Sequence, residues 1–543
     1  MSFKEAKEKK GITLIALVIT IVILIILSTI TINFAFGENG LVTMAETAKA
    51  ESEKDAIIEQ IQLDIADKEI GNQGSINEDE FYEILGKYGT VSADETILTT
   101  TKGNYDILIS DIFSGNIQLS EFELPESMSN DFFNQININY NGETYTTDFD
   151  VSNLKNSSKA IYYLSPDGND SNTGLSREEP LKTFETALNL CNSGDTIYLL
   201  EGMYTRKNWA SSTYPDITKS VNIIGENDKV YIKQGDDYNF TQNEEFNNVY
   251  QTARNNVNQV LDISDLSSGN ISELIEVTSI SECNETSSSY YCDDVNTYIH
   301  MKNEQTPNNE NIIINLKTGS ATFDIRSTEE DIKVYIENIT TLGGHRGNIA
   351  AYGNEQYTPT VLAKNCKFLY SKTEPNEAFS AVTMRSTYSI FQNCEASYSN
   401  NDGFNYHNGV TGKICNAIEI NCIGSNNGKD WETPTCNGTS IHDGGKILRI
   451  DGEYYKNYGG NVADINEGTV SVNLNCYAHD SIAGTNDGYD TDFTAQQAGT
   501  EMYLYSCRAE GSAYNIYAAN ETAIYVQNCI YETTLGDNIS VIE

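Results

Sequence analysis

The chain has 543 residues, and its 34 basic and 78 acidic residues give a formal net charge of −44. This acidity argues against a nucleic-acid partner, because phosphate contacts require a basic surface. It suits an extracellular protein that stays soluble or collects divalent cations such as calcium. The length is too great for one small domain.

The amino terminus predicts a membrane span. Residues 12–36 carry no charge, and as a helix they would be about 37 Å long, enough to cross a bilayer. A flank rich in lysine predicts that the amino terminus stays inside the cell and the remainder lies outside. The flanking lysines are Lys4, Lys7, Lys9 and Lys10.

The run from Lys9 to Val18 resembles the type IV prepilin leaders of Gram-positive bacteria. The resemblance implies a leader at 1–11 that a prepilin peptidase cuts between Gly11 and Ile12. It also implies a pilin-like transmembrane and extended helix at 12–70. The protein would then be a bacterial single-pass protein of the cell membrane, with its carboxyl-terminal domain extracellular.

The same resemblance predicts a polar continuation of the helix near 43–68 and makes other pilins candidate partners in a pilus. One residue departs from the pilin pattern: pilins usually have glutamate at the fifth mature position, where this chain has Ala16. Polymerisation is therefore left open. A plain membrane anchor and a cleaved signal remain alternatives to pilin-type processing.

Residues 71–155 are expected to form a small α+β headpiece or a linker. Glu78–Lys87 has the pattern of a short helix, and three segments have the pattern of strands. The strand segments are Thr96–Thr100, Tyr105–Ile109 and Ile136–Tyr140.

Residues 160–205 carry a recognisable pattern of strands, turns and one short helix. Tyr162–Asp170 is followed by Pro180–Thr183 and then by Gly194–Leu199. This pattern resembles the amino-terminal cap of pectate-lyase-like β-helix proteins, in which a short amphipathic helix, here about 180–192, closes the open end. A solenoid needs such a cap because its first coil would otherwise expose the lumen and unpaired strand edges.

From there to the end the chain repeats. Asn-Cys pairs recur at 365–366, 393–394 and 421–422, each 28 residues after the last, and equivalent pairs continue the series at a mean step of about 27 residues. One strand-like motif per unit at this period is typical of a solenoid. The equivalent pairs are Asn338-Ile339, Arg449-Ile450, Asn475-Cys476, Ser506-Cys507 and Asn528-Cys529.

We therefore predict an all-β fold, a right-handed parallel β-helix over 156–543, whose handedness comes from the resemblance alone. The repeated cysteine is expected to face the lumen as an inert thiol, and the asparagine to bond its equivalents above and below. Cys283 and Cys292 are the one plausible disulfide pair.

A second repeated motif carries the candidate chemistry. Asn401-Asp402-Gly403-Phe404-Asn405 resembles the calcium-site strand of one group of β-helix pectate lyases, in which carboxylates hold calcium for a lysine base. Here two of the three carboxylates are amides, Asn401 and Asn405. The carboxylates at Asp487, Asp490 and Asp492 form a closer match and are predicted calcium ligands. In both places a simple turn before a strand is the alternative.

Two histidines are expected on one outer face. If Phe404 and Ile441 stack in the lumen, Asn405 and His442 lie on neighbouring coils with His407 nearby, and such a patch could abstract and return a proton. The alternative is that these residues cap turns or bind sugar hydroxyls without catalysis. The predicted catalytic residues are His442, Asp443, His407, Asp402 and Arg385, and the predicted substrate-binding residues are Asn405, Tyr406 and Asp464.

The sequence thus predicts a membrane-anchored surface protein that recognises, and in one alternative cleaves, a polysaccharide. A β-helix lyase or glycoside hydrolase explains the histidine patch. A non-catalytic structural pilin or adhesin explains the prepilin-like start. The sequence leaves the choice between them open.

Overall fold

The computed structural model forms two compact units, and the chain passes from the first to the second between Ser120 and Glu121. The predicted leader, the Gly11–Ile12 cleavage site and the span at 12–36 lie outside the described residues. Within the described residues no helix is long and apolar enough to cross a membrane. The described residues are 41–71, 78–92, 97–112, 120–142, 144–206, 216–374, 377, 379–409, 413–429, 436–483 and 490–542.

The first unit packs two helices against a small antiparallel sheet. Ile61 and Ile65 are one helical turn apart and are buried against Phe81 and Leu85 of the next helix. The predicted helices near 43–68 and at Glu78–Lys87 are confirmed. The elements are α2 (Leu41–Gly71), α3 (Glu78–Tyr88), β1 (Gly89–Val91), β2 (Ile97–Thr100), β3 (Asp106–Leu108) and α4 (Ile109–Ile112).

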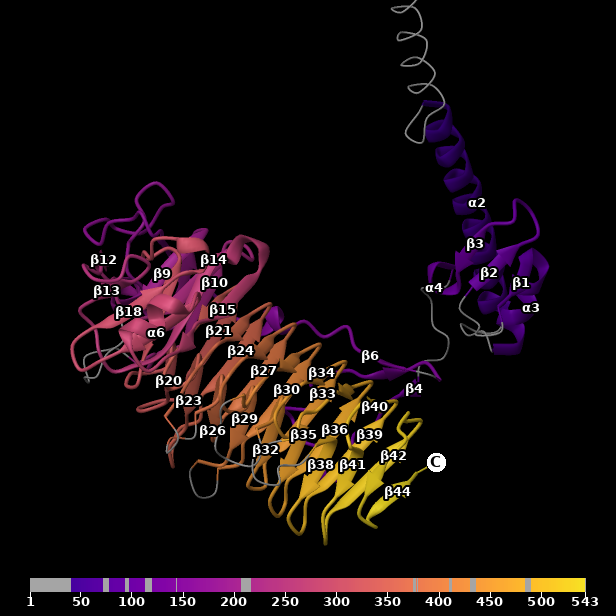
Figure 1. The fold of residues 1–543 in the computed structure, drawn as a ribbon. Coiled ribbons are helices and arrows are strands. Elements are labelled where there is room, and N and C mark those ends of the chain that lie inside the picture. Colours follow the sequence, from indigo (N-terminus) through magenta and orange to yellow (C-terminus); the bar gives the residue numbers. More distant parts are fainter. Residues whose placement is uncertain are drawn as a thin grey trace, which may run out of the picture. The chain divides into compact units, whose positions relative to one another are not determined.

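The second unit is a parallel β-helix, which confirms the predicted solenoid. A complete coil contributes one strand to each of three sheets (Figure 1), which we name A, B and C in the order in which a coil visits them. Among the described residues, sheet A consists of β7 (Ile161–Leu164), β8 (Thr196–Leu199), β10 (Val221–Gly225), β21 (Lys333–Glu337), β24 (Thr360–Lys364), β27 (Tyr388–Gln392), β30 (Asn416–Ile420), β33 (Lys446–Ile450), β36 (Val470–Leu474), β39 (Glu501–Tyr505), β42 (Ala523–Gln527) and β44 (Ile539–Val541).

Sheets B and C complete each coil and also run parallel to their neighbours. Sheet B consists of β9 (Gly202–Arg206), β11 (Val230–Gln234), β22 (Thr340–Leu342), β25 (Lys367–Leu369), β28 (Glu395–Ser397), β31 (Ile423–Ser425), β34 (Glu453–Tyr455), β37 (Tyr477–His479) and β40 (Arg508–Glu510). Sheet C consists of β20 (Phe323–Arg326), β23 (Ile349–Tyr352), β26 (Val382–Arg385), β29 (Phe404–His407), β32 (Thr439–His442), β35 (Gly460–Ile465), β38 (Thr491–Gln496), β41 (Tyr514–Ala518) and β43 (Thr534–Leu535).

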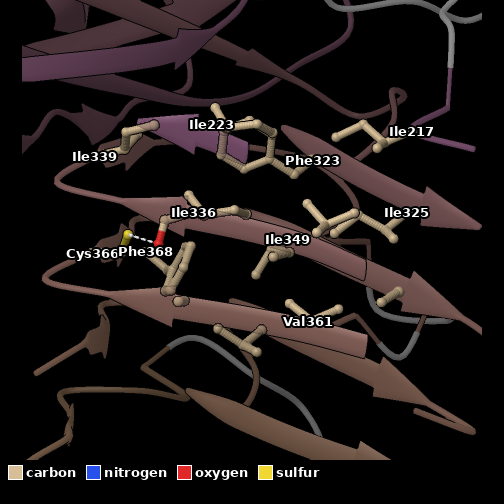
Figure 2. Packing of buried hydrophobic residues seen from close by; sticks show 14 of the residues in the cluster. Ile217, Ile223, Phe323, Ile325, Ile336, Ile339, Ile349, Val361, Cys366 and Phe368 are labelled. Carbon is tan, nitrogen blue, oxygen red and sulfur yellow. Dashed lines mark hydrogen bonds between the residues drawn. The ribbon is translucent and has the colours of Figure 1, made fainter. Parts of the chain in front are cut away.

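The lumen is filled by apolar side chains from all three sheets (Figure 2). Alternate residues of each strand point inward, so Ile336, Phe368 and Ile349 meet from different sheets. The predicted inward thiols are confirmed: Cys366 is buried and its Sγ lies 3.6 Å from the carbonyl oxygen of Ile336. Four further cysteines of the series are buried in the same way, Cys394, Cys422, Cys476 and Cys507.

The asparagine ladder between sheets A and B is also confirmed. Asn365, Asn393 and Asn421 have φ of 52°, 55° and 51°, in the left-handed region that asparagine tolerates. Asn393 Nδ2 donates to Asn365 Oδ1 at 3.0 Å, and Asn421 Nδ2 donates to Asn393 Oδ1 at 3.0 Å. The predicted equivalent at Arg449-Ile450 is wrong. Asp451, with φ of 53°, holds that place, because β33 continues to Ile450.

The predicted cap is confirmed at the first coil. The helix α5 (Phe184–Leu190) begins after Thr183, whose side chain accepts from the backbone N–H of Thr186. Its buried residues Phe184, Ala187 and Leu188 join the core of the lumen.

An insertion, residues 235–322, leaves the solenoid between β11 and β20. Cys283 and Cys292 are both free thiols there, so the predicted disulfide is absent. Its elements are β12 (Thr241–Gln242), β13 (Tyr250–Thr252), β14 (Val257–Asp265), β15 (Asn270–Glu273), β16 (Ile275–Glu276), α6 (Ile280–Glu285), β17 (Ser289–Cys292), β18 (Thr297–His300) and β19 (Ile312–Leu316).

Residues 121–155 do not belong to a headpiece, which corrects the predicted boundary at 155. They form a strap across the outer face of sheet A, where Leu362, Ile390 and Leu448 present an apolar row to it. Its buried Phe133 and Tyr145 cover part of that row. The strap contains β5 (Asn139–Tyr140) and β6 (Tyr145–Thr146), with β4 (Ser120–Glu121) at its start.

Polar contacts fix the strap in register along sheet A. The backbone N–H of Tyr145 donates to Asn475 Oδ1 at 3.0 Å, and that of Val151 donates to Gln392 Oε1 at 2.9 Å. Lys364 Nζ lies 2.7 Å from Asp150 Oδ1. Burying the apolar face beneath the strap removes it from water, which is the main stabilising effect of the arrangement.

Candidate functional site

The last residues of five successive strands of sheet C form one row on the outer surface. Arg326, Tyr352, Arg385 and His407 are consecutive register partners across β20, β23, β26 and β29. His442 ends β32 and stacks on His407, with ring centroids 4.1 Å apart and planes at 14°. Neighbouring positions are about 4.8 Å apart along the solenoid. We call these five residues the Arg–His row.

The first part of the row alternates guanidinium groups and an aromatic ring. The guanidinium carbon of Arg326 lies 4.5 Å from the centroid of the Tyr352 ring, and that of Arg385 lies 6.0 Å from it. Both distances allow cation–π attraction. Arg326 Nε is also held by Asp324 at 2.9 Å and Asp216 at 3.1 Å. Burial raises the pKa of Tyr352 to about 12, so its hydroxyl stays protonated at neutral pH.

The second part of the row is a pair of neutral imidazoles beside a carboxylate. His407 Nδ1 lies 3.2 Å from Asp443 Oδ2, and the two side chains are 30% and 42% exposed. Burial lowers the pKa of His407, although Asp443 opposes the shift. Burial and the adjacent His407 lower the pKa of His442 to about 3. A neutral imidazole oriented by a carboxylate is the form that accepts a proton.

The predicted register between the two histidine motifs is wrong by two residues. Tyr406, and not Phe404, is the register partner of Ile441, while Asn405 pairs with Ser440. His442 therefore stacks on His407 instead of lying beside Asn405. The error arose because Phe404 and Tyr406 both face the lumen, so inward alternation alone fits either pairing.

Asp402 and Asn405 serve the turn that precedes sheet C. Asp402 is 4% exposed, and its carboxylate accepts from the Asn437 backbone N–H, from Asn405 Nδ2 and from Ser440 Oγ, each at 2.7 Å. Asn405 is 7% exposed. Burial raises the pKa of Asp402. The structure thus favours the turn alternative for this motif, because neither side chain reaches the surface where the histidines lie.

Tyr406 and Asp464 are fully buried, so their predicted role in substrate binding is wrong. Tyr406 donates to Glu419 Oε1 at 2.9 Å, and Asp464 Oδ1 accepts from Arg449 Nη2 at 3.0 Å. All four side chains point into the lumen and have no exposed area. This buried polar network is an internal part of the solenoid and cannot contact a polymer.

The predicted calcium ligands are only partly within the described residues. Asp487 lies outside them, and Asp490 Oδ1 accepts from the Ala513 N–H at 3.1 Å. The carboxylate of Asp492 is buried and accepts from Asn461, Asn515 and Ser512, and burial raises its pKa to about 7. In the part of the chain that the structure describes, no group of three His, Cys, Asp or Glu side chains is arranged to hold a metal ion.

Sequence reasoning missed Arg326 and Tyr352, although both end a strand in the same way as Arg385. The signal was available in the repeat, since each is the last residue of a four-residue strand of sheet C. The insertion and the unequal loop lengths between coils concealed it, because the step from β23 to β26 is longer than that from β26 to β29.

No family model and no curated protein matches this sequence. Among solved structures, the chain is similar to a complex of XylC with xylose, at 13% identity over 68% of this chain and 69% of that chain, with a TM-score of 0.44. A glycoside hydrolase matches at 11% identity over 70% of this chain and 95% of that chain, with a TM-score of 0.45. The pectate lyase Pel9A matches at 12% identity over 70% and 78%, with a TM-score of 0.33.

Proposed function

We propose that this chain is a cell-surface protein whose β-helix recognises an extended polysaccharide along the Arg–His row. The observation that carries the proposal is the repetition of cationic, aromatic and imidazole side chains at the coil spacing of about 4.8 Å. A polymer lying along the solenoid would meet one cationic, aromatic or imidazole side chain of the row on each successive coil. Arginine donates to hydroxyl or carboxylate oxygens, and tyrosine offers both a flat apolar ring and a hydroxyl.

The histidine pair supports proton transfer as the chemistry of a cleaving enzyme. His407 is neutral at pH 7, is partly exposed, and has one ring nitrogen held by Asp443. Its other nitrogen is thus in the tautomer that accepts a proton. Arg385, one coil away, could stabilise negative charge that develops on the substrate. In the non-catalytic alternative, the same groups bind sugar hydroxyls only.

We also propose that the span at 12–36 anchors the protein in the cell membrane, after a prepilin peptidase cuts between Gly11 and Ile12. The support is the uncharged stretch behind a lysine-rich leader. Mass spectrometry of the protein purified from membranes should find Ile12 as the first residue. A mature protein that begins at Met1 or near residue 37 would contradict this processing.

A glycan panel tests the proposed function. The purified protein is incubated with polysaccharides, with and without calcium, and both binding and the ultraviolet absorbance of unsaturated products or released reducing ends are measured. Arg385→Ala should weaken binding at least tenfold, whereas His407→Ala should keep binding and abolish any product. Arg508→Ala, an exposed arginine on sheet B, is the matched control and should change neither.

Two outcomes separate the readings. Binding without product on every glycan would assign the row to recognition alone, as in an adhesin. No binding to any glycan, or binding that Arg385→Ala leaves unchanged, would refute the proposed site.

A further inference from the structure

A second concave site lies on a different side of the solenoid from the Arg–His row. It is a groove of about 280 Å³ between the insertion and the turns that follow the strands of sheet B. The volume is close to the lower limit of small-molecule pockets, about 300 Å³. It is lined mainly by Glu273, Tyr370, Lys372, Tyr398, Asn426 and Tyr458.

Two tyrosines in this groove begin an aromatic stack. Tyr370 follows β25 and Tyr398 follows β28, and their rings lie parallel with centroids 4.7 Å apart and planes at 4°. The hydroxyl of Tyr370 donates to the carbonyl of Ile271 in the insertion at 3.2 Å, which fixes that ring. Tyr398 is 43% exposed although it is a large aromatic residue.

The next position of the stack is occupied by a small residue. Tyr370, Tyr398 and Asn426 have equivalent backbone geometry, with φ of 60°, 59° and 57°. Each backbone N–H also donates to the residue that ends the sheet B strand of the next coil, at 3.1–3.2 Å. Asn426 therefore stands at the position equivalent to a third ring, and its shorter side chain, which donates to Ser425 Oγ at 3.0 Å, fills less of the groove beside Tyr398 than a tyrosine would.

The walls of this space are polar, and their charged side chains are Glu273, Lys372 and Lys429. Lys372 Nζ and Glu273 Oε1 form an ion pair at 3.0 Å, with side chains that are 19% and 29% exposed. Asn400 and Asn426 add amide groups, and Tyr458 adds a third tyrosine to the lining. A pyranose ring matches this arrangement, because it has a face of C–H groups that packs on an aromatic ring and an edge of hydroxyls that bonds charged and amide groups.

We propose that this groove is a second saccharide-binding site, which takes one pyranose unit stacked on Tyr398 at the position that a third ring would hold. Glu273 pairs with Lys372, whereas Lys429 adds a further cation to the lining, so the groove suits a neutral or a uronate pyranose. The site acts independently of the Arg–His row and does not depend on the function proposed for that row.

Saturation-transfer NMR on the full-length protein tests the proposal, with glucose, galactose, xylose, N-acetylglucosamine, glucuronate and their β-linked disaccharides as probes. Tyr398→Ala should weaken binding of the best probe at least about tenfold, and Tyr398→Phe should retain it because the ring remains. Asn426→Tyr should abolish it by filling the space, and tyrosine at the two equivalent positions shows that this backbone geometry accepts the change.

Two variants serve as controls. Tyr514→Ala removes a tyrosine that is 39% exposed on β41 of sheet C, and it should leave binding unchanged. His442→Ala disrupts the Arg–His row and should also leave it unchanged. The proposal is overturned if no probe binds, if Tyr398→Ala or Asn426→Tyr leaves binding intact, or if His442→Ala alone removes it.

Discussion

The buried network of the lumen yields a prediction that can be worked from the structure. Arg449 is fully buried; its Nη2 lies 3.0 Å from Asp464 Oδ1, and its Nη1 lies 3.2 Å from Asn473 Oδ1. Glu419 is equally buried and accepts from the hydroxyls of Tyr406, Thr439 and Tyr454. Arg449→Met removes the buried cation and leaves the carboxylates of Glu419 and Asp464 inside the solenoid without a positive charge beside them.

The expected loss is about 3–5 kcal/mol of unfolding free energy at pH 7, the usual result of breaking a buried ion pair on one side. It would be measured as the change in the midpoint of urea unfolding multiplied by the m-value, followed by circular dichroism. Arg508→Met is the matched control. Arg508 is 54% exposed and paired with Glu510 at 2.7 Å, so its loss should cost less than about 1 kcal/mol.

The pH dependence gives the prediction a second readout. Burial raises the pKa of Glu419 in the folded state. A raised carboxyl pKa means that the folded state binds more protons than the unfolded state. The free-energy cost of burying the ionised Glu419 is therefore full at high pH and decreases as the pH falls through the pKa of the folded state. The deficit of Arg449→Met should therefore decrease from pH 7 to pH 5. A deficit below about 1 kcal/mol at pH 7, or one that grows on acidification, would refute the reasoning.

Three further predictions concern the ladder, the histidines and the strap. Asn393→Ala should cost about 2–4 kcal/mol in urea unfolding, because it breaks two ladder bonds and places alanine at a φ of 55°; Asn393→Gly should cost less, and the reverse order would contradict the strain argument. The lowered pKa of His442, about 3, predicts that stability falls below pH 6.5, by at most about 1.4 kcal/mol per pH unit, and His442→Gln should flatten that slope in a pH series of unfolding curves. Lys364 lowers the pKa of Asp150 to about 2, so the contribution of this partly exposed pair, about 1 kcal/mol, is present above pH 4 and is lost as the pH falls from 4 through 2. Lys364→Met should therefore differ from the unaltered protein at pH 6 and converge with it at pH 2, as measured by thermal unfolding.

The sequence alone determined the solenoid, because its physical causes are local and recur in each coil. An inward cysteine and a turn asparagine repeat about every 27 residues, and each makes the same contact with its equivalent one coil away. The cap was equally visible, since its helix must bury one apolar face in the open end of the lumen.

Only the tertiary structure decided which polar residues reach the surface. Asp464 and Arg449 appear in the sequence as ordinary charged residues of strands, yet both face the lumen, where each compensates the other. The alternation of inward and outward residues along the strand was enough to assign His442 to the outer face. The register that stacks it on His407 depends on the lengths and paths of the loops between coils. The strap was hidden for a similar reason: the apolar residues of 121–155 resemble a small core of their own, and only the assembled sheet A provides the row that they cover.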